Sequence, residues 1–183
     1  MYMTKKEKKA IFEAMQQIRN NQRPTSRLNE MFGGRSYSFQ MDNSMRGSFE
    51  DAMIQSGEVY YNFVDNNRNK HQVIFAMDES EMQEVFDVSL RGPNENVDHK
   101  GIMNTMLEIM DDFVGQHDAM AEPDSPETQL RGLNVTFPDQ GFGRHTGMLR
   151  RFAGRNGFRV GGARKHRSAV DGKEMVTIFL QRR

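Results

Sequence analysis

The order in which hydrophobic periodicity changes between residues 132 and 158 is the feature that most constrains the fold of this chain. Residues 132–137 alternate apolar and polar side chains, as a half-buried strand does, and residues 146–156 carry apolar side chains at helical spacing. The Gly157-Phe158 pair then has the form of a helix C-cap followed directly by a new strand. A longer amphipathic helix is predicted upstream, over residues 100–116. Strands joined through helices in this order predict a βαβ unit.

The remaining patterns predict a mostly antiparallel sheet around that unit. Five more strands are predicted from alternating apolar residues, at 58–64, 72–77, 83–90, 158–163 and 175–180. The first three are separated by short polar turns, which favour antiparallel neighbours, and an Asp171-Gly172 turn joins the last two as a hairpin. The predicted fold class is therefore α/β (α+β), with a mixed, mostly antiparallel sheet and a central βαβ unit.

The N-terminal quarter differs from the rest in composition. Residues 4–21 begin with a capping-box pattern and carry one apolar stripe, so a helix is predicted there. Residues 22–47 are rich in Ser, Asn, Arg and Gly, which predicts a loop-rich arm with room for one short strand at 37–41. We therefore predict an N-terminal helix and mobile arm over residues 1–47 and a main domain over 48–183, which opens with a short helix that Gly57 ends.

Two local motifs carry a resemblance to a known family. Residues 152–158 read Phe-Ala-Gly-Arg-Asn-Gly-Phe, and residues 98–103 read Asp-His-Lys-Gly-Ile-Met at the start of the long helix. In this order of elements, over about residues 57–181, the chain resembles the GNAT-type N-acetyltransferase superfamily. The first segment is similar to that family's Phe-Tyr-x-x-x-Gly-Phe motif, and the second is similar to its Arg-x-x-Gly-x-Gly cofactor loop.

The resemblance implies an acetyl-CoA site, from which this chain departs. The family binds the pyrophosphate on backbone N–H groups at a helix start, here Lys100, Gly101 and Ile102. The resemblance further implies a general base on the third strand of the meander, here Glu84 or Asp87. Three departures affect the chemistry: Asp98 stands where the family has Arg, Met103 replaces the second glycine, and Ala153 replaces a proton-donating tyrosine.

The charge of the chain is strongly segregated although the formal net charge is zero. Residues 78–128 hold 14 acidic and 2 basic residues, and residues 141–183 hold 11 basic and 2 acidic residues. The two regions either neutralise each other within the fold, or form patches for protein partners or other copies, or the basic region binds nucleic acid. The candidate partner-binding residues are Arg144, Arg151, Arg155, Arg164, Lys165 and Arg167. No aromatic residue interleaves the basic run from 159 to 173, so base stacking is not indicated.

Several other classes of chemistry lack their signatures. The chain has no Cys, which excludes disulfides, thiolate metal sites and cysteine nucleophiles. No two of its five His residues have the spacing of a zinc site, so no metal is predicted, and neither a P-loop nor a G-x-S-x-G elbow occurs. No apolar run is long enough to span a membrane, which favours a cytoplasmic location, or a virion if the protein is encoded by a phage.

Three hypotheses of function follow. The first is a non-catalytic, degenerate GNAT-fold protein that needs no cofactor and acts through protein–protein association or self-association. A looser resemblance of residues 109–113 and 149–153 to small bacteriophage proteins suggests a phage assembly. The alternative is a divergent acetyl-CoA-dependent N-acyltransferase. The second alternative is a basic nucleic-acid-binding domain.

Overall fold

The computed structural model describes residues 35–42, 47–78, 84–93, 95–122, 124–125 and 128–182. The compact unit that contains them begins at Gly34. The helix predicted over residues 4–21 lies outside the described residues, and so does most of the predicted arm. One part of that arm is described, because residues 39–41 form a strand of the sheet.

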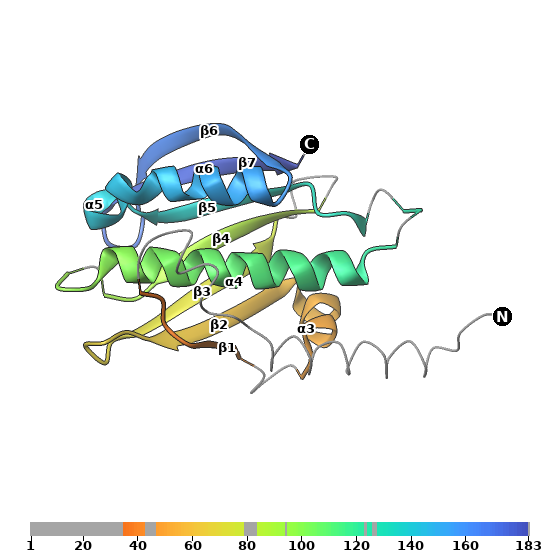
Figure 1. Cartoon of the computed structure of the whole chain (residues 1–183), viewed down its shortest axis with the longest axis horizontal. Coiled ribbons are helices and arrows are strands. Elements are labelled where there is room, and N and C mark those ends of the chain that lie inside the picture. The colour runs from red at the N-terminus through yellow and green to blue at the C-terminus, as the bar shows by residue number, and fades with distance from the viewer. Residues whose placement is uncertain are drawn as a thin grey trace. The chain divides into compact units, whose positions relative to one another are not determined.

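A seven-stranded mixed sheet forms the centre of the domain (Figure 1). Its strands are β1 (Phe39–Met41), β2 (Glu58–Val64), β3 (Lys70–Met77), β4 (Val85–Arg91), β5 (Gly132–Pro138), β6 (Phe158–Arg167) and β7 (Glu174–Arg182). They lie side by side in the order β1-β2-β3-β4-β5-β7-β6. The six strands predicted from alternating apolar and polar residues are all present, and β2 has the predicted bounds.

One pair of neighbouring strands is parallel and the other five pairs are antiparallel. The parallel pair is β4 and β5, which α4 (His99–Met120) connects. The predicted fold class is confirmed, because the sheet is mostly antiparallel and has a βαβ unit at its centre. The order of strands and helices that the sequence patterns predict is therefore present in the structure.

The helices α4 and α6 (Thr146–Arg155) cover the same face of the sheet (Figure 1). Phe86 of β4 meets Phe113 of α4 edge to face at 5.1 Å. The register shows that the same face of the sheet continues from β4 across β5 to Ile178 of β7. Ile178 and Leu149 of α6 line one groove. Phe113 also stacks on Phe75 of β3 at 3.9 Å, so the aromatic core lies between α4 and the centre of the sheet.

The short helix α3 (Phe49–Ser56) follows its predicted caps closely. Ser48 and Asp51 form a capping box, and Gly57 ends the helix in the left-handed conformation at φ 63°. Phe49 reaches the core and lies edge to face with Phe113 at 5.5 Å. The helix is thereby anchored beside α4.

The long helix continues to Met120, beyond the predicted end at residue 116. The Glu108 side chain is buried on this helix, with 9% exposure. His117 in the last turns is also buried, and its Nε2 contacts the Glu84 carboxylate, so tertiary contacts extend the helix past the point where the apolar pattern weakens.

Candidate functional site

The first candidate site lies where the two parallel strands separate. β4 and β5 pair from Val85↔Gly132 to Ser89↔Thr136. Beyond that point β4 still pairs with β3 through Arg91, and β5 still pairs with β7 through Pro138, so the two strands diverge at their carboxyl ends. The helix α4 begins beside this divergence. Ligands of open α/β sheets bind at such a position, which makes the start of α4 the place to examine.

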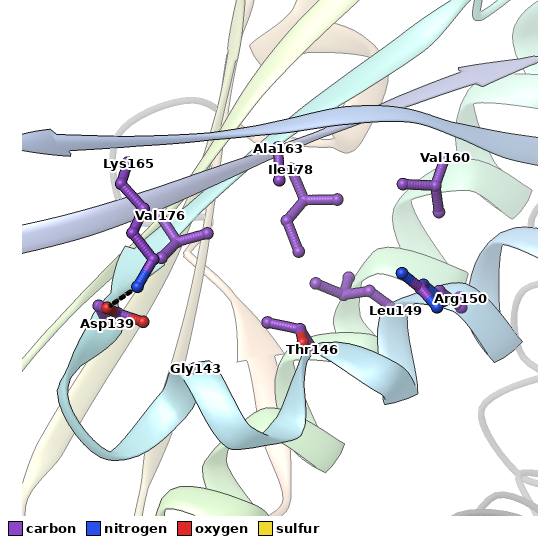
Figure 2. Close-up of a pocket in the computed structure, with 10 residues that line it drawn as sticks. All are labelled: Asp139, Gly143, Thr146, Leu149, Arg150, Val160, Ala163, Lys165, Val176 and Ile178. Atoms are coloured by element: carbon purple, nitrogen blue, oxygen red, sulfur yellow. Dashed lines mark hydrogen bonds and ion pairs between the residues drawn. The ribbon is translucent and has the colours of Figure 1, made fainter.

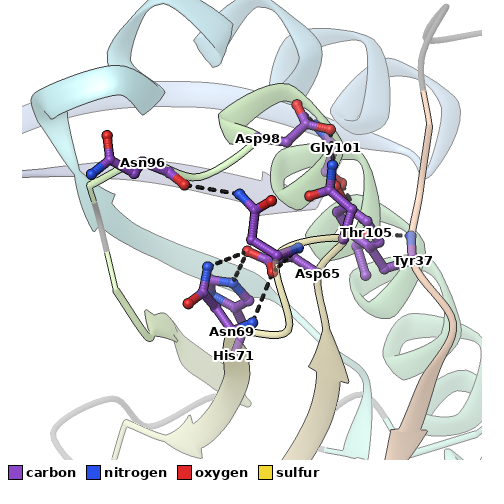
Figure 3. A network of polar contacts seen from close by, with 10 residues as sticks. Tyr37, Asp65, Asn69, His71, Asn96, Asp98, Gly101 and Thr105 are labelled. Atoms are coloured by element: carbon purple, nitrogen blue, oxygen red, sulfur yellow. Dashed lines mark hydrogen bonds and ion pairs between the residues drawn. The ribbon is translucent and has the colours of Figure 1, made fainter.

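Asp98 occupies the start of α4 with its own carboxylate (Figure 3). One oxygen, Oδ1, accepts a hydrogen bond from the Gly101 N–H at 3.0 Å, and the other, Oδ2, accepts one from the Tyr37 hydroxyl at 3.0 Å. The Tyr37 N–H donates to Thr105 Oγ1 at 2.8 Å, which holds the ring against the first turn of the helix. A Cβ added to Gly101 would lie 3.0 Å from Cε2 of Tyr37, so this turn is tightly packed.

The electrostatics of this turn are set by the half-buried Asp98 carboxylate and the buried Tyr37 phenol. Burial, followed by the hydrogen bond and the charge of Asp98, raises the pKa of Tyr37 to about 12. Tyr37 is therefore a neutral donor at neutral pH. The arrangement places a negative charge where the helix dipole and free N–H groups would otherwise attract an anion.

A second polar network fixes the turn between β2 and β3 next to Asp98 (Figure 3). The buried Asp65 carboxylate accepts hydrogen bonds from the backbone N–H groups of Asn67 and Asn69, and lies 3.0 Å from His71 Nε2. Burial alone would raise the pKa of Asp65, but the hydrogen bonds from His71 and Asn69 outweigh it and lower the pKa. The Asn67 side chain donates to the Asn96 carbonyl at 3.0 Å, which ties this turn to the loop before α4.

The residues predicted to hold acetyl-CoA do not fit its pyrophosphate. The Gly101 N–H is already bonded to Asp98, and Ile102 is fully buried. Lys100 is exposed at the helix start, but the Asp98 carboxylate precedes it by two residues. Met103 is also fully buried among the core residues, so the obstruction at the helix start comes from Asp98.

The two His residues near the start of α4 do not supply a positive charge that would attract a pyrophosphate. His99 packs its ring edge to face on Phe142 at 4.7 Å. Burial, and then the nearby charge of Arg144, lowers the pKa of His145, so that its imidazole is neutral at neutral pH. The Arg144 Nε–H donates to Nε2 of this ring at 3.2 Å. Arg144 thus stands near the start of α4 as an exposed cation.

The two predicted bases are not brought to the start of α4. Glu84 pairs with His117, which lies 16 residues after Gly101 and therefore about 24 Å further along the helix axis. Asp87 is exposed on the sheet face opposite the helices, where it accepts a hydrogen bond from Asn134 at 2.9 Å. The polar network around Tyr37 and Asp65 has no local signal in the sequence, because residues 65–67 have the pattern of an ordinary turn and Tyr37 that of a strand residue.

The second candidate site is the basic region around α6 and the β6–β7 hairpin. Acidic partners neutralise part of it: Arg155 lies 3.7 Å from Asp111, and Lys165 lies 2.6 Å from Asp139. Arg182 forms a bidentate ion pair with Asp118, in which Nη1 donates to Oδ1 at 2.5 Å and Nη2 donates to Oδ2 at 2.6 Å. The charge segregation of the sequence is thus partly resolved within the fold.

Other cations of this region remain directed to solvent. The predicted residues Arg144, Arg151, Arg164 and Arg167 are all exposed, as is Arg150. Across the part of the chain that the structure describes, no ion pair is formed by Arg150, Arg164 or Arg167. These three come from α6 and β6, so one end of the sheet presents positive charge.

A groove of about 510 Å³ lies between α6 and the hairpin (Figure 2). Its lining is mainly apolar and is formed by Leu149, Val160, Ala163, Val176 and Ile178. Figure 2 shows Arg150 at one end and the Lys165–Asp139 pair at the other. The groove therefore has an apolar lining and has cations of the basic region at its ends.

Comparisons with known proteins find similarity in structure. No protein-family model and no curated protein matches the chain. An acetyltransferase of the GNAT family from Streptococcus pneumoniae has 10% identity and a TM-score of 0.36, covering 73% of this chain and 71% of that chain. Ribosomal-protein-S5-alanine acetyltransferase from Vibrio fischeri has 15% identity and a TM-score of 0.38, covering 67% and 60%. Arabidopsis thaliana NAA60 in complex with a bisubstrate analogue has 14% identity and a TM-score of 0.36, covering 92% and 91%.

At these identities and TM-scores, neither the activity nor the ligands of those proteins extend to this chain.

Two further observations concern membrane-spanning helices and metal sites. Among the residues that the structure describes, no helix is long and apolar enough to cross a bilayer. The same residues contain no group of three or more acidic or His side chains that could hold a metal ion.

Proposed function

We propose that this protein has a GNAT-like fold but acts by binding another macromolecule, and that it does not transfer acetyl groups. The observation that carries the proposal is the Asp98 carboxylate at the start of α4, which takes the Gly101 N–H and is held by the Tyr37 hydroxyl. A pyrophosphate at this turn would have to displace the part-buried hydrogen bonds of Asp98 and approach a negative charge. Both requirements oppose binding.

The basic region around α6 and β6 is the proposed contact surface. Arg150, Arg164 and Arg167 are exposed and form no ion pair among the described residues. Exposed cations of one sign attract partners of the opposite sign and speed their association. A place in a phage assembly, and a cytoplasmic or virion location, stay predictions from the sequence.

Isothermal titration calorimetry with acetyl-CoA tests the proposal. The wild-type protein is expected to show no saturable heat at millimolar coenzyme. Asp98→Asn removes the charge and keeps a side-chain cap, so it should bind the coenzyme better than the wild type does. Asp87→Asn is the matched control, because it removes the same charge from an exposed position on β4. Micromolar binding of acetyl-CoA by the wild type would overturn the proposal.

A divergent N-acyltransferase is the second candidate function. The end of pairing between β4 and β5 after Ser89 and Thr136 favours it, because ligands of open α/β sheets bind at the carboxyl ends of strands that part in this way. A thiol-release assay with acetyl-CoA, small amines and peptide N-termini distinguishes the two functions. Release of CoA above the rate without protein, and loss of it in a variant of the site, would establish the enzyme.

A further inference from the structure

The outer edge of β6 is a ten-residue strand edge with cations along it. β6 stands at the end of the strand order and pairs with β7 on its inner side. Its other side is the edge of the sheet, where, for the described residues, no strand follows. Such an edge offers a row of backbone donors and acceptors to an incoming strand.

The two faces of this edge differ in chemistry. The register shifts at a bulge between Val160 and Gly162, and it thereby places both Val160 and Ala163 on the face covered by α6, because their partners Leu180 and Ile178 face the core. Arg164 pairs with Thr177 and therefore projects from the opposite face, as Arg159 does opposite Gln181. Side chains of an added strand alternate between the same two faces.

The face toward α6 has room for apolar side chains. The groove of about 510 Å³ runs beside Val160 and Ala163, and Leu149 of α6 forms its far wall (Figure 2). Val160 is 38% exposed, which leaves apolar surface at the edge itself. A valine or leucine from an added strand would cover this surface and leave water.

We propose that an extended acidic segment of a partner protein adds to β6 as an eighth strand of the sheet. Alternate apolar side chains of that segment would enter the groove, and the acidic side chains between them would meet Arg159 and Arg164. The inference deepens the proposed function, on which it rests, by naming the chemistry of the partner. Arg150 and Arg167 would attract the acidic flanks of the same segment.

The groove favours an acidic peptide over a nucleic acid. A phosphate backbone pairs with arginines, but it has no side chain that fills an apolar groove, and residues 159–167 contain no aromatic ring on which a base would stack. Pairing of two copies through β6 is opposed by their like charges, since basic side chains on an edge strand repel a second copy of that strand.

A synthetic ten-residue peptide of alternating Glu and Val, capped at both ends and labelled with fluorescein, is the probe. Its binding to the full-length protein is measured by fluorescence anisotropy. Three controls separate the contributions: a block peptide of the same composition, an alternating peptide with Lys in place of Glu, and an alternating peptide with N-methylated valines. A short DNA duplex with the same label is measured in parallel.

Variants on the two faces of β6 identify the binding edge. Arg164→Glu reverses the charge on one face, and Ala163→Glu introduces an acid into the groove on the other. Each should weaken binding of the alternating peptide by about tenfold. Lys70→Glu is the matched control, because it makes the same charge reversal at an exposed position on β3, far from β6 in the sheet. Circular dichroism confirms that each variant folds.

The peptide and DNA measurements distinguish strand addition from general charge attraction and from nucleic-acid binding. Tighter binding of the alternating peptide than of all three controls, with loss in the two β6 variants and no loss in Lys70→Glu, supports strand addition. Equal binding of alternating and block peptides, or an equal effect of Lys70→Glu, overturns it in favour of general charge attraction. Preferential binding of the DNA duplex overturns it in favour of a nucleic-acid surface. These outcomes are independent of acetyl-CoA binding, which tests the proposed function separately.

Discussion

Replacing Asp98 by alanine should destabilise the domain and lower the pKa of Tyr37. The substitution removes the side-chain cap of α4, which contributes about 1 kcal/mol to the free energy of unfolding. It also removes the acceptor of the Tyr37 hydroxyl at 3.0 Å, worth about another 1 kcal/mol because Asn66 remains within 3.2 Å of the hydroxyl. The total of about 2 kcal/mol corresponds to a fall in Tm of about 4–8 °C for a domain of this size.

The change in the pKa of Tyr37 separates this account from a general loss of stability. Asp98 raises that pKa through its hydrogen bond and its charge, whereas burial is the largest cause and remains in the variant. The pKa should therefore fall from about 12 and stay above its ordinary value of 10.0. Urea unfolding gives the stability, and the absorbance of tyrosinate against pH gives the pKa. An unchanged titration of Tyr37 in Asp98→Ala would refute the contact between the two side chains.

Three further predictions concern stability. Gly154→Ala on α6 should stabilise the protein by about 0.5–1 kcal/mol, because its Cβ would meet nothing within 4 Å. Gly101→Ala should instead destabilise the protein, because its Cβ would crowd Tyr37. Thermal unfolding of the two variants compares these effects. Phe113→Ala should cost about 3–5 kcal/mol in urea unfolding, and Val170→Ala, at a position 97% exposed, should cost almost nothing. The lowered pKa of Asp65 means that its stabilising effect is present above its unfolded pKa of about 3.9 and is lost as pH falls through the folded value. The difference in stability between the wild type and Asp65→Asn should therefore shrink below about pH 4.

The secondary structure could be predicted because each element has a local signal. The strand β2 has its predicted bounds, since its alternation of apolar and polar residues ends at the polar turn at Asp65. The helix α3 was predictable from Ser48 and Gly57, because caps depend on neighbouring residues of the chain. The end of α4 was not predictable, because contacts of His117 and Asp118 with other elements extend it.

The candidate sites depend on contacts between distant residues, which local patterns do not contain. Tyr37 and Asp98 are 61 residues apart, and no periodicity links them. Glu84 and Gly101 are close in sequence, but the direction of α4 places the partner of Glu84 far from the start of the helix. The predicted partner-binding residues divide into those that form an ion pair, such as Arg155, and those that do not, such as Arg164, according to which acidic side chains the fold brings near.

The sequence alone determined the order of strands and helices, the fold class and the separation of charge, because these follow from periodicity, caps and composition. The tertiary structure decided where the charges meet, which polar groups fill the start of α4, and that β6 is an edge with an apolar groove beside it. Burial, register and the neighbours of a side chain arise when distant segments pack together, and they decide which residues remain available for a partner.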